Sequence, residues 1–346
     1  MGHDVTNNVI NSVINNVTSA MNQNLNQQTE GIDAITYSTE AWDEAAKFFA
    51  DWGLKNISHS AALQEWETLN GARVNVRRTA DATLAPPIEA GPTLREVVWG
   101  VRTDTQLDAL ATALASAPGF KDQRSSHGTV QALDPHGLQI VFQKSAKHSI
   151  DIQGVATNTW DEARRIDKPS PIYDSAQPIE IGHVVLFTDK LDVAEAFYAG
   201  LGFTTSDRYP GRGIFMRCSV EGGHHDIFLL QLPGKASGLN HVAFTVRDIH
   251  EVFGGGLNMS RKGWKTQLGP GKHPISSAFF WYFENPCGGL IEYNADEDHL
   301  THNWLARDFA PSPTAFAEWA IDGGIDGFTR RQPKVAASGA FLTEKR

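Results

Sequence analysis

The alternation of apolar and polar residues predicts short strands and helices, and the predicted elements occur in the same order in both halves of the chain. Each half begins with a short strand, a turn and a helix that ends before a glycine. Strand-like segments follow, and the last one comes directly after a turn that contains Pro and Gly. Three pairs of segments match in order: 34–54 with 182–203, 94–103 with 239–248, and 134–142 with 285–293.

This internal repeat predicts an α+β fold built from two copies of a strand–helix–strands module, residues 31–150 and 179–300. Residues 151–178 carry prolines and charges with little periodicity, which is typical of a linker. Residues 1–30 are rich in Asn and Gln and have apolar residues at helical spacing. We therefore expect a helical arm that packs on the body or on another subunit, or else a frayed arm. Residues 301–346 form a tail.

Charge and cysteine content narrow the class of protein. The formal net charge is −10, from 40 acidic and 30 basic residues, so we expect no nucleic-acid partner. The chain has no apolar run of membrane-spanning length, and its first residues lack the features of a signal peptide. Cys218 and Cys287 are the only cysteines, which excludes a disulfide framework and a thiolate metal site. We expect a cytoplasmic protein without a membrane partner.

Two histidines and one glutamate of the second copy lie on predicted strands and form the candidate site. His241 opens the strand HVAFTV, and Glu292 lies in the strand GLIEYN. The third strand is IEIGHVVLF. Because side chains alternate between the two faces of a strand, one of its faces carries Ile181, His183, Val185 and Phe187. Two imidazoles and one carboxylate that leave coordination positions open form the facial arrangement of non-haem Fe(II) oxygenases. The same ligand types also suit Mn(II) or Zn(II), so they do not fix the metal.

The first copy differs from the second at these three positions. Where the second copy has His183, His241 and Glu292, the first has Ala34, Glu96 and Val141. A single histidine on a strand is more often a hydrogen-bonded core or surface residue than a ligand. The presence of all three residues in one copy, at equivalent ends of repeated modules, favours a metal site there.

The second copy resembles the catalytic domain of the type I extradiol dioxygenases, which belong to the vicinal oxygen chelate, or glyoxalase–bleomycin resistance, superfamily. The resemblance is nearest to the homoprotocatechuate 2,3-dioxygenases and the dihydroxybiphenyl dioxygenases, and it is specific only in this copy. The segments that carry it are GHVVLF, HHDIFLL, LNHVAF, GPGKHPISSAFFWYFENP and GLIEYN. It implies tandem modules of paired βαβββ units in curved, partly closed mixed sheets.

The resemblance also implies an activity: cleavage of a catechol-type ring by O2 at a mononuclear Fe(II) site, in aromatic catabolism. Fe(II) would bind to His183, His241 and Glu292, called the triad from here on, with Mn(II) as the alternative metal. His225 would be the acid–base residue, and its neighbour His224 is the weaker candidate. His273, after a GPG turn, and Tyr282 would contact the substrate and oxygen. We further expect a homo-oligomer.

The sequence departs from the homoprotocatechuate pattern at several positions. Leu268 replaces an arginine that holds a substrate carboxylate, and no equivalent of a second arginine is evident within 303–307. A neutral or hydrophobic catechol is therefore expected. Val185 replaces a polar residue, which is expected to alter oxygen handling.

The tail is rich in aromatic residues and leaves two interpretations open. Phe309, Phe316 and Trp319 either close over the site as part of a lid or form a packing stripe.

Two rival functions remain open. A glyoxalase-like metal-dependent isomerase or transferase usually builds its site from both modules or across a dimer, whereas here one module supplies the whole triad. A non-catalytic protein of the same fold, which binds a planar molecule, has no need of two histidines and a glutamate on its sheet. Metal analysis separates the three functions: iron favours the dioxygenase, zinc or nickel the isomerase, and no metal the binding protein.

Overall fold

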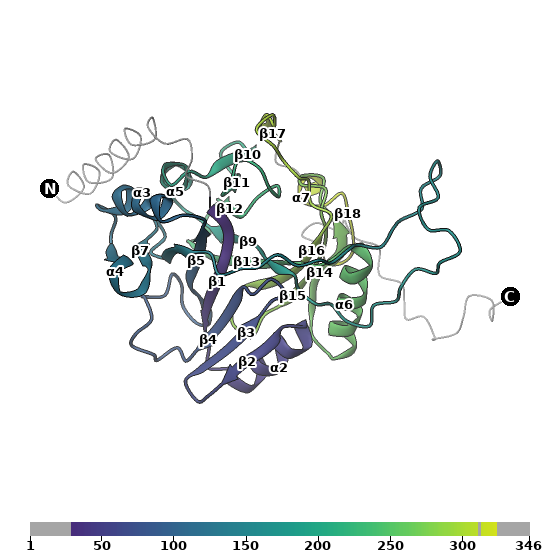
Figure 1. The fold of residues 1–346 in the computed structure, drawn as a ribbon, viewed down its shortest axis with the longest axis horizontal. Helices are drawn as coiled ribbons and strands as arrows, with labels where there is room; N and C mark the ends of the chain where they lie inside the picture. The colour runs from purple at the N-terminus through teal and green to yellow at the C-terminus, as the bar shows by residue number, and fades with distance from the viewer. Residues whose placement is uncertain (1–28, 311–312, 324–346) are drawn as a thin grey trace.

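The computed structural model describes residues 29–310 and 313–323, and its strands form two large mixed sheets (Figure 1). The strands of the first sheet are β1 (Thr29–Ser38), β2 (Lys55–His59), β3 (Leu63–Glu67), β4 (Arg73–Arg77), β5 (Thr93–Val101), β6 (Lys121–Gln123), β7 (Thr129–Leu133) and β8 (Gln139–Lys144). Their order in space is β2-β3-β4-β1-β5-β8-β7-β6.

The second sheet is larger and carries the candidate ligands. Its strands are β9 (Glu180–Phe187), β10 (Thr204–Tyr209), β11 (Gly213–Arg217), β12 (Ile227–Leu230), β13 (Gly238–Thr245), β14 (Thr266–Lys272), β15 (Phe279–Glu284), β16 (Leu290–Ala295), β17 (Arg307–Asp308) and β18 (Trp319–Gly323). Their order in space is β17-β10-β11-β12-β9-β13-β16-β15-β14-β18, so the sheet is open rather than a closed barrel.

Each sheet is a pair of strand–helix–three-strand units joined through their first strands. The helices are α2 (Trp42–Trp52), α3 (Asp104–Leu114), α4 (Arg124–His127), α5 (Leu191–Gly200), α6 (Ile249–Arg261) and α7 (Pro313–Phe316). In the first sheet β1 pairs antiparallel with β5, and in the second sheet β9 pairs antiparallel with β13. The two sheets therefore have the same central topology, and the expected α+β fold of paired βαβββ units is confirmed.

The N-terminus and the glycines of α6 show how local sequence fixes the packing. The Asp248 side chain accepts the backbone N–H groups of His250 and Glu251, which caps the helix. A Cβ atom at Gly256 would lie 2.0 Å from the Trp281 ring, and one at Gly254 would lie 2.2 Å from a backbone oxygen. Glycine costs a helix about 1 kcal/mol relative to alanine, but here Gly256 permits close contact with β15 and Gly254 permits close contact with Tyr173 of the segment between the sheets.

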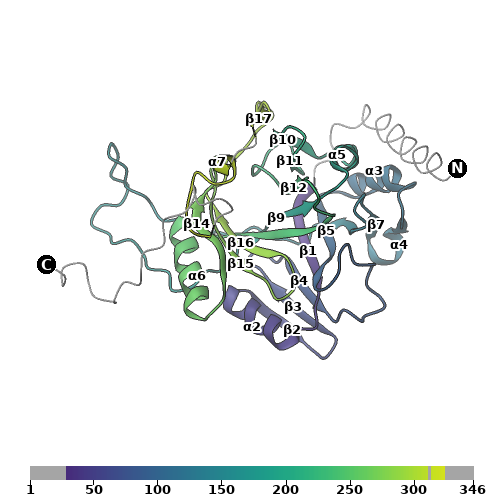
Figure 2. The same cartoon turned by 180° about the vertical axis from the view of Figure 1, so that it is seen from behind.

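One apolar core spans both sheets, because a helix of each packs against the other. Trp52, at the end of α2, stacks on Tyr293 of β16 with ring centroids 3.6 Å apart, and Figure 2 shows α2 beside α6. A helix of the second module likewise contacts the first module. Tyr198 of α5 donates a hydrogen bond of 2.8 Å to Asp134, in the turn before β8. The two modules are therefore interlocked.

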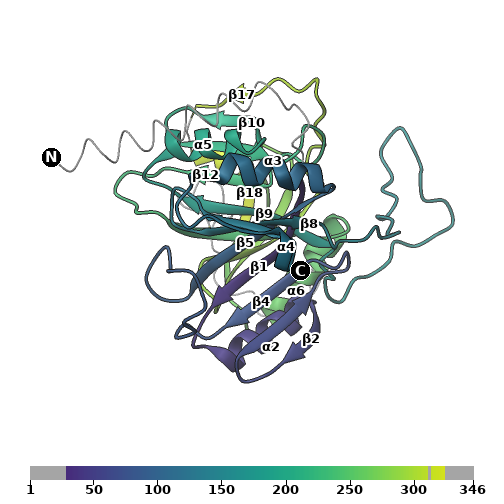
Figure 3. The same cartoon turned by 60° about the vertical axis from the view of Figure 1, so that its left-hand side comes forward.

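The segment between the sheets projects from this core. Residues 145–179, all of which the structure describes, contain neither helix nor strand, and Figure 3 shows the segment as an extended loop. Trp160 in this loop is fully exposed. The linker boundaries 151–178 stay a prediction. The expected helical arm 1–30 lies almost entirely outside the described residues, as does the tail beyond residue 323. Among the described residues, no helix is both long and apolar enough to cross a bilayer.

Candidate metal centre

Three adjacent strands in the middle of the second sheet bring the predicted ligands together. Ala243 of β13 is opposite His183 of β9 on one side and opposite Glu292 of β16 on the other. His241 lies two residues before Ala243, on the same strand. Its Nε2 atom is 3.2 Å from Nε2 of His183, and both nitrogens are 3.2 Å from Oε2 of Glu292. All three side chains are buried.

The predicted face of β9 is wrong at one position. His183 and Val185 line a small cavity beside the candidate ligands, called the chamber from here on. Ile181 instead belongs to the main core, together with Val184. The pairing of β9 with β13 shifts register between His183 and Ile181, as in a β-bulge. A bulge inserts one unpaired residue and reverses the alternation beyond it, which a strict period of two does not anticipate.

The first sheet confirms the internal alignment of the two copies. Glu96 is paired with Gln139, just as His241 is paired with Leu290, so Glu96 and His241 occupy equivalent positions. In the first sheet the place of the triad is taken by a small apolar cluster of Ala34, Val98 and Val141. The contact between Ala34 and Val141 in the first sheet is therefore apolar, whereas the equivalent contact between His183 and Glu292 in the second sheet is polar.

The environment of Glu292 fits a bound cation. Neither carboxylate oxygen has a hydrogen-bond partner among the described residues, although the residue is completely buried. A buried carboxylate without partners costs several kcal/mol of free energy unless a cation or donor satisfies it. Ligand atoms bound to a metal at about 2.1 Å and near right angles lie about 3 Å apart. The triangle of ligand atoms has this size.

The protonation states also suit a cation. Burial lowers the pKa of His183, and burial lowers that of His241 to about 4. Burial would raise the pKa of Glu292, but the approach of His183, His241 and His273 outweighs it and holds that pKa well below its ordinary range. Neutral imidazoles and an ionised carboxylate are the forms that bind metals.

One neighbouring residue fixes the orientation of a ligand. Nδ1–H of His241 donates a hydrogen bond to Oδ1 of Asn240 at 2.6 Å. This places the proton on Nδ1 and leaves the Nε2 lone pair free to bind a metal. Asn240 precedes the ligand directly, but no sequence pattern marks it as part of the site.

The three further residues expected from the sequence all line the same chamber. The ring of His225 lies beside that of His183, tilted by 32°, with ring centroids 4.0 Å apart. The hydroxyl of Tyr282 donates to Nε2 of His273 at 3.1 Å, because Nδ1–H of His273 is used in a bond to the carbonyl oxygen of Phe316 at 2.7 Å. Burial raises the pKa of Tyr282, and Glu292 raises it further, so the phenol remains a hydrogen-bond donor.

His224 lies outside this chamber, although it is also buried. Its Nε2 atom bonds to Asp207, a residue that sequence reasoning missed. Glu297, also missed, lies with Oε1 2.9 Å from Nδ1 of His225. His183, His225 and Glu297 form a second possible ligand trio. We favour the trio that contains Glu292, because its carboxylate is fully buried whereas the Glu297 side chain is 20% exposed.

A large apolar cavity adjoins the chamber. The chamber holds about 40 Å³ and the cavity about 760 Å³, and five residues line both. These shared residues are Tyr209, Phe228, Tyr282, Ala315 and Phe316. Leu268, expected where an arginine would bind a carboxylate, contributes to the apolar wall. The chamber alone is smaller than an aromatic ring, so a ring that reaches the triad would also extend into the adjoining cavity, which has room for an apolar substituent.

The described part of the tail closes one side of these cavities. The hydroxyl of Tyr209 donates to the carbonyl oxygen of Ala315 at 2.6 Å, and β18 pairs with β14 along the sheet edge. Phe316 lines both cavities, Phe309 packs near Tyr209, and Trp319 lies beside Phe279. The lid remains a prediction.

The expected GPG turn is part of a strand. Gly269 and Gly271 lie within β14 and pair with β18, and His273 follows the strand. The pairing of β14 with β15 shifts register between Leu268 and Gly271, so an irregular strand accommodates a sequence that is typical of a turn.

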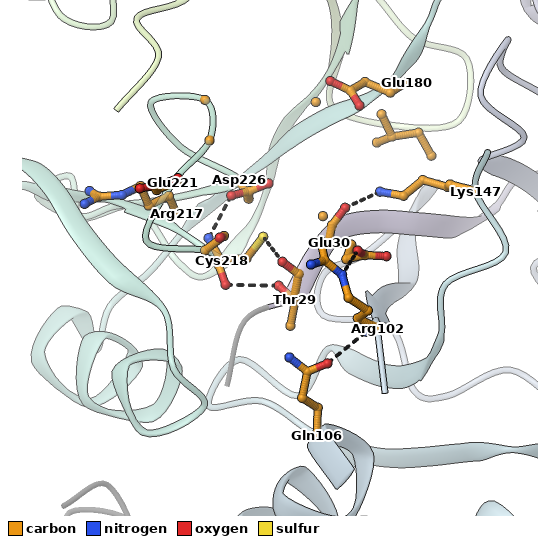
Figure 4. Close-up of a pocket in the computed structure, with 16 residues that line it drawn as sticks. Thr29, Glu30, Arg102, Gln106, Lys147, Glu180, Arg217, Cys218, Glu221 and Asp226 are labelled. Atoms are coloured by element: carbon orange, nitrogen blue, oxygen red, sulfur yellow. Dashed lines mark hydrogen bonds and ion pairs between the residues drawn. The ribbon is translucent and has the colours of Figure 1, made fainter. Parts of the chain in front are cut away.

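Asp226, which follows His225 in the chain, lines a separate polar pocket of about 310 Å³ (Figure 4). Asp226 accepts the N–H of Cys218 at 2.7 Å, while Lys147 enters from the opposite wall. Burial raises the pKa of Asp226 to about 6. Because His225 and Asp226 line different cavities, the polar pocket is not an extension of the candidate centre.

Residues 180–293, which contain the triad, match the Glyoxalase/Bleomycin resistance protein/Dioxygenase superfamily. Metapyrocatechase 2 of Cupriavidus necator is 33% identical over 148 residues, which cover 42% of this chain and 45% of that protein. Metapyrocatechase of Pseudomonas sp. (strain CF600) is 25% identical over 142 residues, 38% of this chain and 45% of that protein. The chain thus spans less than half the length of these curated relatives.

Solved structures share the fold across most of the chain. The Mn(II)-bound glyoxalase from Novosphingobium aromaticivorans has a TM-score of 0.67 at 22% identity and covers 90% of this chain and 97% of its own. Homoprotocatechuate 2,3-dioxygenase from Arthrobacter globiformis has a TM-score of 0.65 at 16% identity, with 89% and 96% covered. At these identities the structural likeness establishes the fold alone.

Proposed function

Because residues 180–293 form a domain of the Glyoxalase/Bleomycin resistance protein/Dioxygenase superfamily, we propose that the chain is an extradiol dioxygenase. It would open a catechol-type ring with O2 at Fe(II) held by His183, His241 and Glu292. One observation carries the proposal: His183 and His241, each 3.2 Å from Glu292, line a single small chamber together with His225, His273 and Tyr282, which carry groups able to exchange protons or form hydrogen bonds. The metapyrocatechase relatives support the same reaction class.

The iron would supply a Lewis acid that lowers the pKa of a catechol hydroxyl and a redox centre that can engage O2. Mn(II) is the alternative, since the same ligands suit both ions. Buried imidazole nitrogens and a buried carboxylate without hydrogen-bond partners favour either ion over an empty site.

Different side chains of the chamber would accept the substrate proton and donate hydrogen bonds to the substrate oxygens. Burial lowers the pKa of His225 well below its ordinary value, so its ring is neutral and can accept a proton from the substrate. The Tyr282 phenol, which donates to His273 in this structure, would turn this hydrogen bond to an oxygen on which negative charge develops. Each such group is worth about 3 kcal/mol in the transition state.

The apolar residues would orient the ring and exclude water. Phe228, Val185 and Ile275 pack together beside the chamber. An apolar wall favours the flat face of an aromatic ring, and the adjoining cavity has room for an apolar substituent. We therefore propose a neutral or hydrophobic catechol rather than one with a carboxylate.

The decisive experiment loads anaerobically purified protein with Fe(II) and supplies catechol, a 3-alkylcatechol, biphenyl-2,3-diol and 3,4-dihydroxyphenylacetate. We expect a yellow ring-opened product with equal O2 uptake, and the neutral substrates should be favoured. Inactivity of iron-loaded protein across the whole panel would refute the dioxygenase. Turnover of a glutathione hemithioacetal by Zn(II)- or Ni(II)-loaded protein would favour the isomerase instead. Failure to bind any of these metals would favour a binding protein.

We also propose that the chain assembles with further copies of itself. Trp160 is fully exposed in the loop between the sheets, and Ile172 in the same loop is 88% exposed. Exposed apolar side chains on one segment are typical of a surface that is covered in an assembly. Light scattering coupled to gel filtration tests this, with a monomer as the contrary result.

A further inference from the structure

His224, the neighbour of the proposed acid–base residue, lies within a buried polar network. Its Nε2 atom is 2.9 Å from Oδ2 of Asp207 on β10, and neither residue is exposed. Its Nδ1 atom faces Nδ1 of His225 at 3.3 Å in hydrogen-bonding geometry. A chain of contacts therefore runs from Asp207 through His224 to the ring that lines the chamber.

Arg307 balances the charge of Asp207. Its Nη2 atom lies 2.6 Å from Oδ2, and its Nε and backbone nitrogen lie 3.1 and 2.8 Å from Oδ1. Burial would raise the pKa of Asp207, but the bonds from His224 and Arg307 outweigh it and lower that pKa. Asp207 is therefore an anion that only accepts hydrogen bonds, so Nε2 of His224 must carry a proton.

This proton determines where the proton of His225 resides. Since Arg307 already neutralises Asp207, His224 needs no positive charge, and a neutral imidazole with its proton on Nε2 is an acceptor at Nδ1. Only Nδ1–H of His225 can donate to it at this contact. Oε1 of Glu297 lies 2.9 Å from the same nitrogen without hydrogen-bonding geometry, so its negative charge favours a proton there without accepting a hydrogen bond. The acceptor is Nδ1 of His224, and a proton on Nδ1 of His225 leaves Nε2 of that ring free as a base.

The same carboxylate anchors the segment that leads into the tail. β17 runs parallel to β10, with Arg307 opposite Asp207. The indole of Trp304 donates to the carbonyl oxygen of Ser206 at 2.8 Å, and the Arg307 guanidinium lies 4.4 Å above the Trp304 ring. The position of this segment and the network at His225 therefore depend on one residue.

We propose that Asp207 and His224 are positioning residues that hold His225 in its Nδ1-protonated form, so that Nε2 accepts the substrate proton. The catalytic consequence rests on the proposed dioxygenase function, whereas the position of the proton does not. A carboxylate that fixes the tautomer of a histidine base can contribute up to about 10⁴-fold to kcat. Here the carboxylate acts through a second imidazole, so a smaller effect is expected.

The test reads the tautomer directly in metal-free protein labelled with ¹⁵N-histidine, by long-range ¹H–¹⁵N correlation. Wild type is compared with Asp207→Asn, and His225→Gln assigns the signal. Glu195→Gln is the matched control, because it removes a carboxylate that pairs with Arg208, the neighbour of Asp207 on the same strand. We expect Nδ1-protonated His225 in wild type and control, and loss of that form in Asp207→Asn.

Kinetics of the iron-loaded proteins give a second readout. Asp207→Asn should lower kcat by about 10- to 100-fold and change KM by no more than about 2-fold, with iron content unchanged. If this variant does not fold, His224→Phe, which removes both ring nitrogens but keeps the pair of Asp207 and Arg307, should lose the same tautomer.

Two results would overturn the inference: His225 protonated on Nε2 in wild type, or an unchanged tautomer in the folded variants. If wild-type protein opens no catechol, the dioxygenase function fails, while the NMR result still decides where the proton lies.

Discussion

Nδ1 of His273 lies 2.7 Å from the carbonyl oxygen of Phe316, so the described tail holds a side chain of the candidate centre by a backbone contact. Truncation after residue 310 removes this acceptor together with β18. We expect kcat of the iron-loaded protein to fall about 10- to 100-fold with iron content retained, because His273 loses its orientation. Truncation after residue 323 is the control and should keep full activity. Equal kcat in both truncated proteins would show that the tail does not act on His273.

Ligand and base can be separated by paired alanine variants. His241→Ala should lose iron, because the triad loses one of three donors. His225→Ala should keep its iron and lose turnover by about 10²- to 10⁴-fold, the usual contribution of a general base. Metal analysis and product formation are measured on the same preparations. Glu96→Gln, at the position equivalent to His241 in the first sheet, should match wild type in both. Iron bound at wild-type stoichiometry by His241→Ala would contradict the ligand assignment.

The hydrogen bond of Asn240 to His241 should appear in metal affinity. Asn240→Ala removes the acceptor that keeps the proton on Nδ1, so we expect iron affinity to fall about 10- to 100-fold. Competition with a chromogenic chelator measures this. Asn240→Asp retains an oxygen acceptor and should stay near wild type; an equal loss in both variants would point to packing instead.

Acid should destabilise the metal-free protein through the triad. Burial lowers the pKa of His241 to about 4, against an ordinary value of about 6.5, so between these pH values only the unfolded chain takes up the proton. Stability is therefore fully present above pH 6.5 and falls as the pH drops to about 4, by about 3 kcal/mol for this group. Glu292, whose pKa is also lowered, acts in the same direction. Chemical denaturation at stepped pH checks this, and His241→Gln should show a flatter profile.

The stack of Trp52 on Tyr293 should be a main source of stability between the two modules. Trp52 is completely buried, and its backbone carbonyl accepts the hydroxyl of Tyr293 at 2.8 Å. Trp52→Ala should lower the free energy of unfolding by about 3–5 kcal/mol through the cavity it creates. Trp160→Ala, in the exposed loop, should cost less than about 0.5 kcal/mol in the monomer. Equal losses would contradict the interlocked core.

The sequence predicted the triad because the repeat supplied an internal comparison. His183, His241 and Glu292 stand at positions where the first copy has Ala34, Glu96 and Val141, and strand register reproduces that equivalence. The bulge that turns Ile181 away from the chamber could not be predicted, since it depends on pairing with β13 rather than on the local pattern.

The network around His224 was also beyond sequence reasoning. Asp207 and Arg307 are 100 residues apart, and only the parallel pairing of β17 with β10 brings them together. A buried carboxylate and a basic residue carry no pattern of their own, because their meaning depends on the partner that tertiary structure provides. The lesser candidate of the two adjacent histidines thus acquires a role that its position in the motif did not suggest.

The apolar cluster of Ala34, Val98 and Val141 makes the first sheet complete without any ion, and the shared core ties this sheet to the second. If the proposed iron is removed, we expect the ion-free sheet to hold the other sheet in shape through this shared core. Depletion and resupply of iron should then restore the proposed activity in a simple binding step, without a folding transition.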